Sequence, residues 1–160
     1  RVATIGEGAA SKRDEVVISV GGNTANISGR LELQAGAKTE VVSVDLGSGE
    51  TSMTYITKLN GADAQAVHSG IFMAGNEEVK KVNARVEHLV HDCRSDAIVK
   101  GVATGNGKGE YTGRVYAAQD AQHTEAYQQS RNLLVRKAAR QLPSPQLEID
   151  ADGVTCSHGA

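Results

Sequence analysis

Hydrophobic and polar residues alternate along most of this chain, in short runs separated by glycine-rich turns. The alternation is clearest in Leu31-Glu32-Leu33 and in Glu40–Asp45. A period of two with many β-branched residues is typical of strands, whose successive side chains point to opposite faces. The strands predicted in this way are 16–20, 23–28, 31–33, 40–45, 51–57, 66–74, 82–90, 97–103 and 110–117. We therefore expect an all-β protein.

One segment gives a conflicting signal. Residues 132–142 are rich in helix-favouring residues and stop before Pro143, which predicts a short helix when the segment is read alone. In a series of strands, Leu133-Leu134-Val135 is better interpreted as a buried strand and the basic residues after it as a turn. We adopt the second interpretation.

A short internal similarity suggests that the strands repeat. Gly29-Arg30-Leu31 leads into 37–41, and Gly113-Arg114-Val115 leads into the similar run 121–126. The two starts are 84 residues apart, which predicts four turns of a coil with roughly 21 residues each, within the usual range of solenoid repeats. Strands at such spacing, without helices between them, indicate a β-helix. With only two copies, chance similarity is the alternative.

Length and composition restrict the interior and the partners. The chain has 160 residues, enough for one domain with its own core. With no Trp and one Phe, that core must consist of Val, Ile, Leu and Ala. A formal charge of −2 gives no reason to expect nucleic acid or an anionic membrane as partner. No apolar run approaches the roughly 20 residues of a membrane span, and no signal-peptide pattern opens the chain.

The cysteine content favours a reducing compartment. Two cysteines, Cys93 and Cys156, are too few for a disulfide framework, so a cytoplasmic protein is the simpler interpretation. The chain starts on Arg1 without a methionine and ends just past its last histidine. We expect it to be the core fragment of a longer chain.

The last residues carry the clearest candidate chemistry. Cys156 and His158 are two positions apart, so in an extended strand both side chains would point to the same face. A thiol and an imidazole are ligands suited to iron, iron–sulfur clusters, zinc or copper. Two donors cannot complete a tetrahedral site, so other ligands must come from elsewhere in this chain or from another chain. The alternative is a small buried thiol beside a surface histidine.

A second cysteine is a weaker candidate. Cys93 could be another thiol ligand or a sulfur-relay site, and His91 would share its face if the segment were a strand. A small, buried apolar role for Cys93 is the alternative. Among the other histidines, His68 and His88 have no partner that the sequence predicts. His123 occupies the place of Lys38 in the repeated turn, which favours a structural role.

Three carboxylates near the end of the chain alternate in sequence. Glu148, Asp150 and Asp152 would lie on one face if this segment were extended. They could serve as acid/base groups or oxygen ligands, and a hydrated strand face is the alternative.

The C-terminal half contains a series of blocks that together resemble a known family. In order, they are Lys100-Gly101-Val102, Tyr111–Val115, Ala121–Ala126, Gln129–Val135, Pro145–Ile149 and Asp152–Ala160. From about His91 to Ala160, the chain is similar to the SufB/SufD family of iron–sulfur cluster assembly proteins. Before His91 the expected similarity is only architectural.

This resemblance implies a fold, a function and partners. It implies a right-handed parallel β-helix, expected here as a single core domain over residues 1–160. It also implies a non-enzymatic scaffold in a Suf-type complex, working with a SufC-like ABC-type ATPase that docks on a C-terminal helical region outside this chain. The other expected partners are a second SufB/SufD-like chain and a sulfur donor. A transient iron–sulfur cluster would form where two β-helix cores meet, and ATP would act only through the ATPase.

The resemblance also gives the last residues a role. It assigns Cys156 and His158 as ligands of the cluster at the dimer interface. The Cys-x-His-Gly form resembles SufD more than SufB, whose matching segment tends to carry His-Glu. The first half of the chain departs from both patterns, so a SufD-like protein and a self-pairing SufB/SufD-like protein both remain open.

Two functions outside the family are alternatives. The first is a structural β-helix that polymerises end to end through uncovered rungs. The second is a carbohydrate-acting β-helix enzyme that uses Asp150 and Asp152 as its carboxylate pair. The shortage of aromatic residues for stacking on sugars weakens the second alternative.

Overall fold

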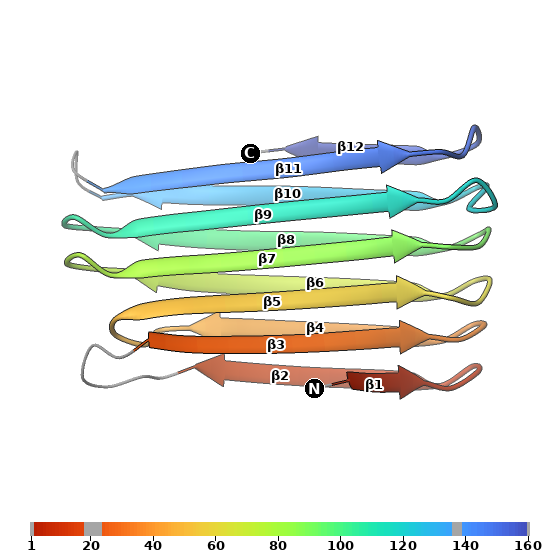
Figure 1. The fold of residues 1–160 in the computed structure, drawn as a ribbon, viewed down its shortest axis with the longest axis horizontal. Coiled ribbons are helices and arrows are strands. Elements are labelled where there is room, and N and C mark those ends of the chain that lie inside the picture. Colours follow the sequence, from red (N-terminus) through yellow and green to blue (C-terminus); the bar gives the residue numbers. More distant parts are fainter. Residues whose placement is uncertain (1, 18–23, 136–138, 160) are drawn as a thin grey trace.

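The computed structural model describes residues 2–17, 24–135 and 139–159, which form two parallel β-sheets (Figure 1). The first sheet contains β1 (Val2–Ile5), β3 (Thr24–Leu33), β5 (Glu50–Leu59), β7 (Val79–His88), β9 (Lys108–Ala117) and β11 (Arg140–Ile149). The second sheet contains β2 (Ala10–Val17), β4 (Lys38–Asp45), β6 (Gln65–Ala74), β8 (Arg94–Ala103), β10 (Glu125–Leu134) and β12 (Thr155–Gly159). Odd-numbered and even-numbered strands thus alternate between the two sheets.

The chain winds as a right-handed coil. In Figure 1 the nearer strands run from left to right and the farther ones return, while the chain climbs from the N-terminus to the C-terminus. Each strand pairs in parallel with the strand one turn earlier and one turn later. The predicted all-β, right-handed parallel β-helix is confirmed. Within the part of the chain that the structure describes, no helix is long and apolar enough to cross a membrane.

The predicted length of the repeat is wrong. Gly29 pairs with Tyr55, Tyr55 with Ala84, and Ala84 with Gly113. The two Gly-Arg-aliphatic runs therefore occupy the same register, three turns apart and not four. A third of their separation is about 28 residues per turn, which still lies within the range of solenoid repeats. Two ten-residue strands, such as β5 and β6, and two connecting turns need this much chain.

The second half of the internal similarity is out of register. Lys38 belongs to a row of Cα partners that continues through Gln65 and Arg94 to Glu125. His123 therefore does not stand where Lys38 stands, and that expectation is wrong. The turn before β10, residues 118–124, is longer than the turn before β4, residues 34–37, which shifts the two similar runs against each other.

The segment with the conflicting signal contains a strand, as predicted, but the prediction that this strand is buried is wrong. Leu133 and Leu134 close β10, and β11 begins at Arg140. Residues 133–135 are exposed, with 52–60% of their surface accessible, so the predicted buried strand is corrected to an exposed one. Leu133 is exposed because it points to the outer face, as its Cα partner Val102 does, and Leu134 is exposed because β12 pairs only with residues 125–129 of β10. The segment after Val135, up to Leu142, is the predicted turn: residues 136–138 lie outside the described part of the chain, and Arg140–Leu142 belong to β11, so that part of the prediction is wrong.

The interior is filled by inward-facing side chains from both sheets. The main cluster is aliphatic, with Leu31, Leu33 and Leu59 at its centre, as composition predicts. The single phenylalanine, Phe72, is fully buried. A Cβ atom at Gly101 or Gly109 would lie 2.3 or 2.4 Å from its ring, so two glycines, one on β8 and one on β9 in the opposite sheet, leave the space that the ring fills.

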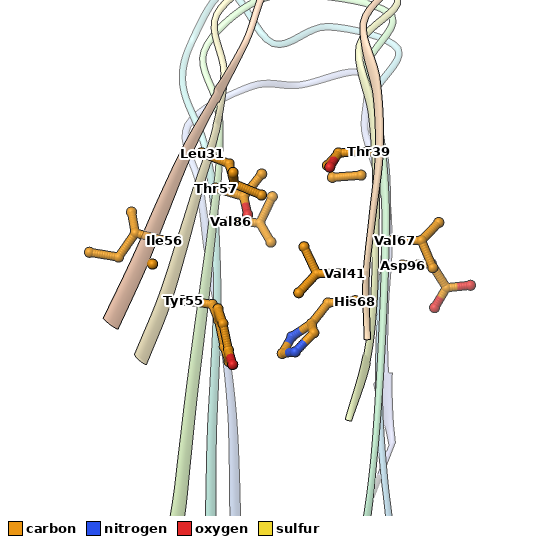
Figure 2. Close-up of a pocket in the computed structure, with 12 residues that line it drawn as sticks. Leu31, Thr39, Val41, Tyr55, Ile56, Thr57, Val67, His68, Val86 and Asp96 are labelled. Carbon is orange, nitrogen blue, oxygen red and sulfur yellow. The ribbon is translucent and has the colours of Figure 1, made fainter. Parts of the chain in front are cut away.

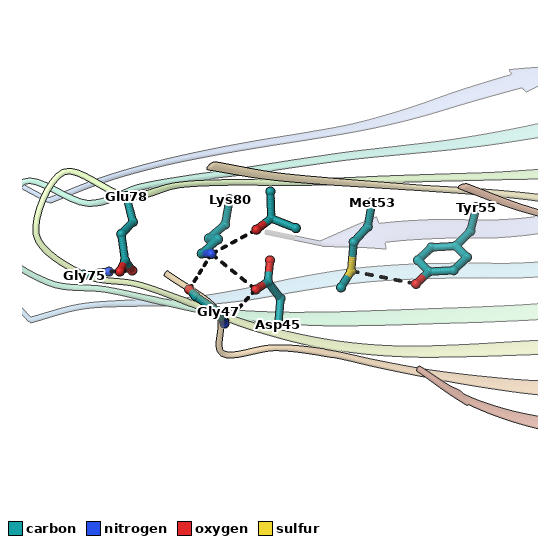
Figure 3. A network of polar contacts seen from close by, with 8 residues as sticks. Asp45, Gly47, Met53, Tyr55, Gly75, Glu78 and Lys80 are labelled. Carbon is teal, nitrogen blue, oxygen red and sulfur yellow. Dashed lines mark hydrogen bonds and ion pairs between the residues drawn. The ribbon is translucent and has the colours of Figure 1, made fainter. Parts of the chain in front are cut away.

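One end of the interior holds a buried ion pair (Figure 3). Lys80 Nζ lies 3.3 Å from Asp45 Oδ1, and their side chains are 0% and 2% exposed. The ammonium also donates to the carbonyl oxygen of Gly47 at 2.6 Å and to Thr51 Oγ1 at 3.1 Å. The carboxylate accepts the backbone N–H of Gly47 at 3.1 Å. The pair thus joins β7 to β4 and to the turn after β4.

Two histidines lie inside the coil without a charge. His68 Nε2 is 3.1 Å from Ser43 Oγ, and its ring centre is 4.8 Å from that of Tyr55 across the interior (Figure 2). His88 Nε2 is 2.8 Å from Ser95 Oγ. Burial lowers the pKa of each imidazole to about 4. Both are neutral at pH 7, and their burial and their hydrogen bonds to serine side chains indicate a structural role.

The buried ion pair gives a first prediction. Replacing Lys80 with Met leaves the Asp45 carboxylate buried and unpaired, so we expect the free energy of unfolding to fall by about 3–5 kcal/mol. Lys81→Met is the matched control, because Lys81 forms an exposed pair with Glu50 at 3.6 Å and should cost less than about 1 kcal/mol. Urea unfolding followed by circular dichroism measures both. Equal losses for the two variants would contradict the assigned role of Lys80.

The buried histidines give a second prediction, on pH dependence. As the pH falls from about 6.5, the unfolded chain protonates His68 and His88, whereas the folded chain does so only near pH 4. The contribution of each histidine to stability is therefore complete above pH 6.5 and is lost towards pH 4, by about 3 kcal/mol each. Unfolding midpoints at pH 7 and pH 5 measure the loss. The double variant His68→Gln/His88→Gln should show a clearly smaller difference, and an unchanged difference would refute the prediction.

Candidate functional site

Cys156 and His158 lie on the last rung of the coil. Both belong to β12, where Cys156 pairs with Ala126 and His158 with Gln128 of β10. Ala126 and Gln128 are buried and face the interior, so the same side of β12 faces the interior as well. Within the described part of the chain, β12 is the edge of the second sheet. The thiol and the imidazole therefore share the inner face of an uncovered strand.

The surroundings of the two side chains differ. Cys156 is half-buried and packs against the main hydrophobic cluster, as Leu147 of β11 does from the opposite sheet. His158 is exposed. Below it, the Gln128 side chain crosses the interior, and its Nε2 donates to the carbonyl oxygen of Gln146 on β11 at 3.2 Å. Gln128 thus links the two sheets directly beneath His158.

Burial raises the pKa of the Cys156 thiol, and a hydrogen bond from the backbone of Ala126 offsets part of that effect. The thiol is therefore protonated at neutral pH in the isolated chain. A metal ion binds the thiolate, so binding at Cys156 would release a proton. The thiolate ligand would therefore form only when the metal ion binds, and it is not present beforehand.

The chain supplies an incomplete set of ligands. In the part of the chain that the structure describes, no group of three or more His, Cys, Asp or Glu side chains is placed to hold a metal ion. Among the described residues, Cys156 and His158 are thus two donors at the edge of the second sheet. Further donors must come from elsewhere in the protein or from another chain.

Cys93 lies away from this end of the coil. It is 1% exposed and immediately precedes β8, two strands below β12 in the second sheet. Its thiol donates to the carbonyl oxygens of Gly61 at 3.3 Å and His91 at 3.5 Å, and burial raises its pKa. Two strand spacings amount to about 9.6 Å, beyond the reach of a disulfide between the two cysteines. The structure does not bring Cys93 and Cys156 together.

His91 does not share a strand face with Cys93. It lies in the turn before β8, is exposed, and its Nδ1 is 2.6 Å from Asp92 Oδ2. The other carboxylate oxygen of Asp92 is 3.5 Å from Nδ1 of His123 in the next turn. The three side chains link two neighbouring turns at the surface.

The three alternating carboxylates do not form one row. Glu148 lies on β11, and Asp150 follows that strand and accepts a hydrogen bond from Tyr116 Oη at 3.0 Å. Asp152 lies in the bend before β12. Since Asp150 and Asp152 are separated by the change of direction, the carboxylate pair of a carbohydrate-acting enzyme gains no support.

Sequence reasoning missed Gln128. Its importance depends on register, because only the pairing of β10 with β12 places it under His158. A regular repeat of about 28 residues would have paired Gln128 with Cys156, because 30 residues separate the Cα partners Gln128 and His158 in this turn of the coil.

Comparison with known proteins identifies the family. Residues 4–160 match the family described as SUF system FeS cluster assembly, SufBD core domain. The iron–sulfur cluster assembly protein SufD of Escherichia coli K12 is 35% identical over 115 residues, covering 72% of this chain and 27% of SufD. A SufBD family protein of Synechocystis is 31% identical over 134 residues, covering 81% of this chain and 26% of that protein. One of Mycobacterium tuberculosis H37Rv is 27% identical over 134 residues, covering 84% and 16%.

The extent of the match corrects one expectation. The sequence blocks predict only architectural similarity before His91, but the family match begins at residue 4. The chain spans about a quarter of the length of the E. coli and Synechocystis relatives. It belongs to the SufB/SufD family of iron–sulfur cluster assembly proteins, and residues 4–160 match the SufBD core domain.

Proposed function

We propose that residues 1–160 act as one β-helix core domain of a scaffold on which an iron–sulfur cluster is assembled between two such cores. Cys156 and His158 are the ligands that this chain contributes, and the cluster is the cargo of the scaffold. The observation that carries the proposal is that both donors face inward on β12, which is the edge strand of the second sheet in the described residues. Thiolate and imidazole are known ligands of iron–sulfur clusters.

The uncovered end also suits pairing with a second core. In the described residues, β11 and β12 are edge strands, each with one row of backbone N–H and C=O groups facing no further strand. Exposed apolar residues lie beside this edge, with Leu134 and Leu142 52% and 63% exposed. A second β-helix core, identical or related, would cover both features and supply the missing donors.

An incomplete ligand set suits a scaffold that must release its product. With half of the ligands on each core, separation of the cores by a small movement would break the site. We infer that a SufC-like ABC-type ATPase drives this movement, which requires that its two nucleotide states favour different arrangements of the cores. A sulfur donor and a cytoplasmic location complete the proposal. This chain then needs no enzymatic turnover of its own.

Reconstitution tests the proposed ligands. The full-length chain, produced together with its partner chain and ATPase, would be incubated anaerobically with ferrous iron and sulfide and followed by absorption spectroscopy. We expect a cluster spectrum in the wild type and at least a tenfold loss in Cys156→Ala/His158→Ala. Cys93→Ala is the matched control and should retain the spectrum, since Cys93 is buried two strands away.

Three outcomes would contradict this proposal in different ways. An equal spectrum in the Cys156→Ala/His158→Ala variant would reduce the pair to packing residues. Loss of the spectrum in Cys93→Ala alone would move the site to the turn before β8. Formation of long polymers through the edge strands, with no cluster in any variant, would favour the structural β-helix.

Thiol labelling provides a separate prediction. In the apo complex under non-denaturing conditions, a small alkylating reagent should modify half-buried Cys156 and leave Cys93, which is 1% exposed, unmodified. Loading with iron and sulfide should slow modification of Cys156 at least tenfold, because a thiolate bound to iron is not free to react. Mass spectrometry of the peptides measures both sites. Unchanged labelling of Cys156 after loading would exclude it as a ligand.

A further inference from the structure

The outer face of the second sheet carries an exposed apolar strip. Its members lie near or just past the C-terminal ends of their strands and are Val44, Leu46, Ile71, Met73, Val102 and Leu133. Four of them have 41–60% of their surface exposed, Leu46, Ile71, Met73 and Leu133. Beside the strip lies a shallow depression of about 270 Å³, lined in part by Ser69 and Ile98.

The strip follows the register of the sheet. Val44 pairs with Ile71, while Met73 pairs with Val102 and Val102 with Leu133. The strip therefore runs across four strands, along the axis of the coil, and not along any one strand. Contiguous exposed apolar surface of this kind marks interaction sites in soluble proteins.

The fold itself does not require this strip. The corresponding outer face of the first sheet is mostly polar and internally paired. Lys58 Nζ lies 2.8 Å from Glu87 Oε2, and Asn83 and Arg114 hold polar neighbours on adjacent strands. A β-helix face exposed to water is thus built from polar residues on one side of this molecule and from apolar ones on the other.

The charged residues beside the strip are both cations. Lys100 and Arg131 are Cα partners on β8 and β10, both exposed, next to the rows of apolar residues. Neither forms an ion pair with any residue that the structure describes. The carboxylates of the same outer face lie towards the other ends of the strands, where Glu40 pairs with Lys12 and Glu125 with Arg94.

We propose that this apolar strip docks an amphipathic α-helix of a partner protein, with acidic residues beside the apolar stripe of that helix. The spacing of the strands favours a helix lying along the coil axis. Neighbouring strands are about 4.8 Å apart, and a helix places one side chain per turn of about 5.4 Å on each. The acidic residues would neutralise Lys100 and Arg131.

The charges disfavour two other occupants. A second copy of this chain, related by a two-fold axis, would bring Lys100 and Arg131 near their own copies, and such contacts between like charges are unfavourable. A membrane surface normally requires a larger cluster of cations, and this chain has a formal charge of −2.

The test uses synthetic peptides as probes. One is a fluorescent amphipathic helix of about four turns with leucines on one face and glutamates flanking them, and the other has lysines in place of the glutamates. Fluorescence anisotropy would measure binding of each to the full-length chain. We expect the acidic peptide to bind at least tenfold more tightly than the basic one, and the preference to shrink as salt is added.

Variants locate the binding to the strip. Ile71→Ser/Met73→Ser should weaken binding of the acidic peptide at least tenfold. Lys100→Gln/Arg131→Gln should remove the preference for the acidic peptide over the basic one. Ile56→Ser/Lys58→Gln, on the outer face of the first sheet, is the matched control and should bind as the wild type does. Circular dichroism checks that each variant is folded.

Several outcomes would overturn the proposal. Equal binding of the two peptides, or binding that survives both strip variants, would exclude a helix with acidic residues as occupant. Binding of phosphatidylcholine/phosphatidylglycerol vesicles that is lost in Ile71→Ser/Met73→Ser would assign the strip to a membrane. Concentration-dependent dimers, lost in the same variant during sedimentation, would assign it to a second copy. Cys156 and His158 lie elsewhere, so the cluster spectrum of these variants reports separately on the proposed function.

Discussion

Parallel, in-register pairing of each strand with the strand one turn earlier is the constraint on which this structure depends. It places Thr39, Ala66, Ser95, Ala126 and Cys156 in one inward row. Each rung covers the edge of the one below. Among the described residues, Cys156 and His158 lie on the last strand of this sheet, whereas the rows beneath it are covered. A shift of one residue would turn Cys156 and His158 to the outside.

Regular stacking also decides how polar groups are tolerated inside. Lys80 is buried with Asp45 of β4 and the carbonyl oxygen of Gly47, in the turn after β4, as partners. His88 is buried as a neutral ring hydrogen-bonded to Ser95. These groups link rungs without creating a binding site. His158 is instead exposed on the last strand, and this contrast separates the buried structural histidines from the candidate ligand His158.

The sequence was sufficient for the strands but not for their stacking. Alternation in Glu40–Asp45 and the other runs is a local property, so the all-β class and the same-face relation of Cys156 and His158 could be derived from it. The number of residues per turn depends on which strands pair. That is a long-range property, and the shared Gly-Arg-aliphatic runs were correct in register but were assigned to four turns and not three. Exposure of Leu134 likewise depends on which residues of β10 are covered by β12, which no pattern within residues 132–142 reveals.

The position of the candidate ligands at an edge has a consequence for affinity. A site with all its ligands in one rigid core would hold a cluster firmly, because no ligand could leave without unfolding a rung. With two donors on one rim, the binding free energy depends on how a second molecule is held above it, and a change in that arrangement changes the affinity directly. The apolar strip lies on an outer face of the same sheet as β12. A partner bound there would contact the strands that support the rim without occupying it, so docking and cluster release can be combined on one chain.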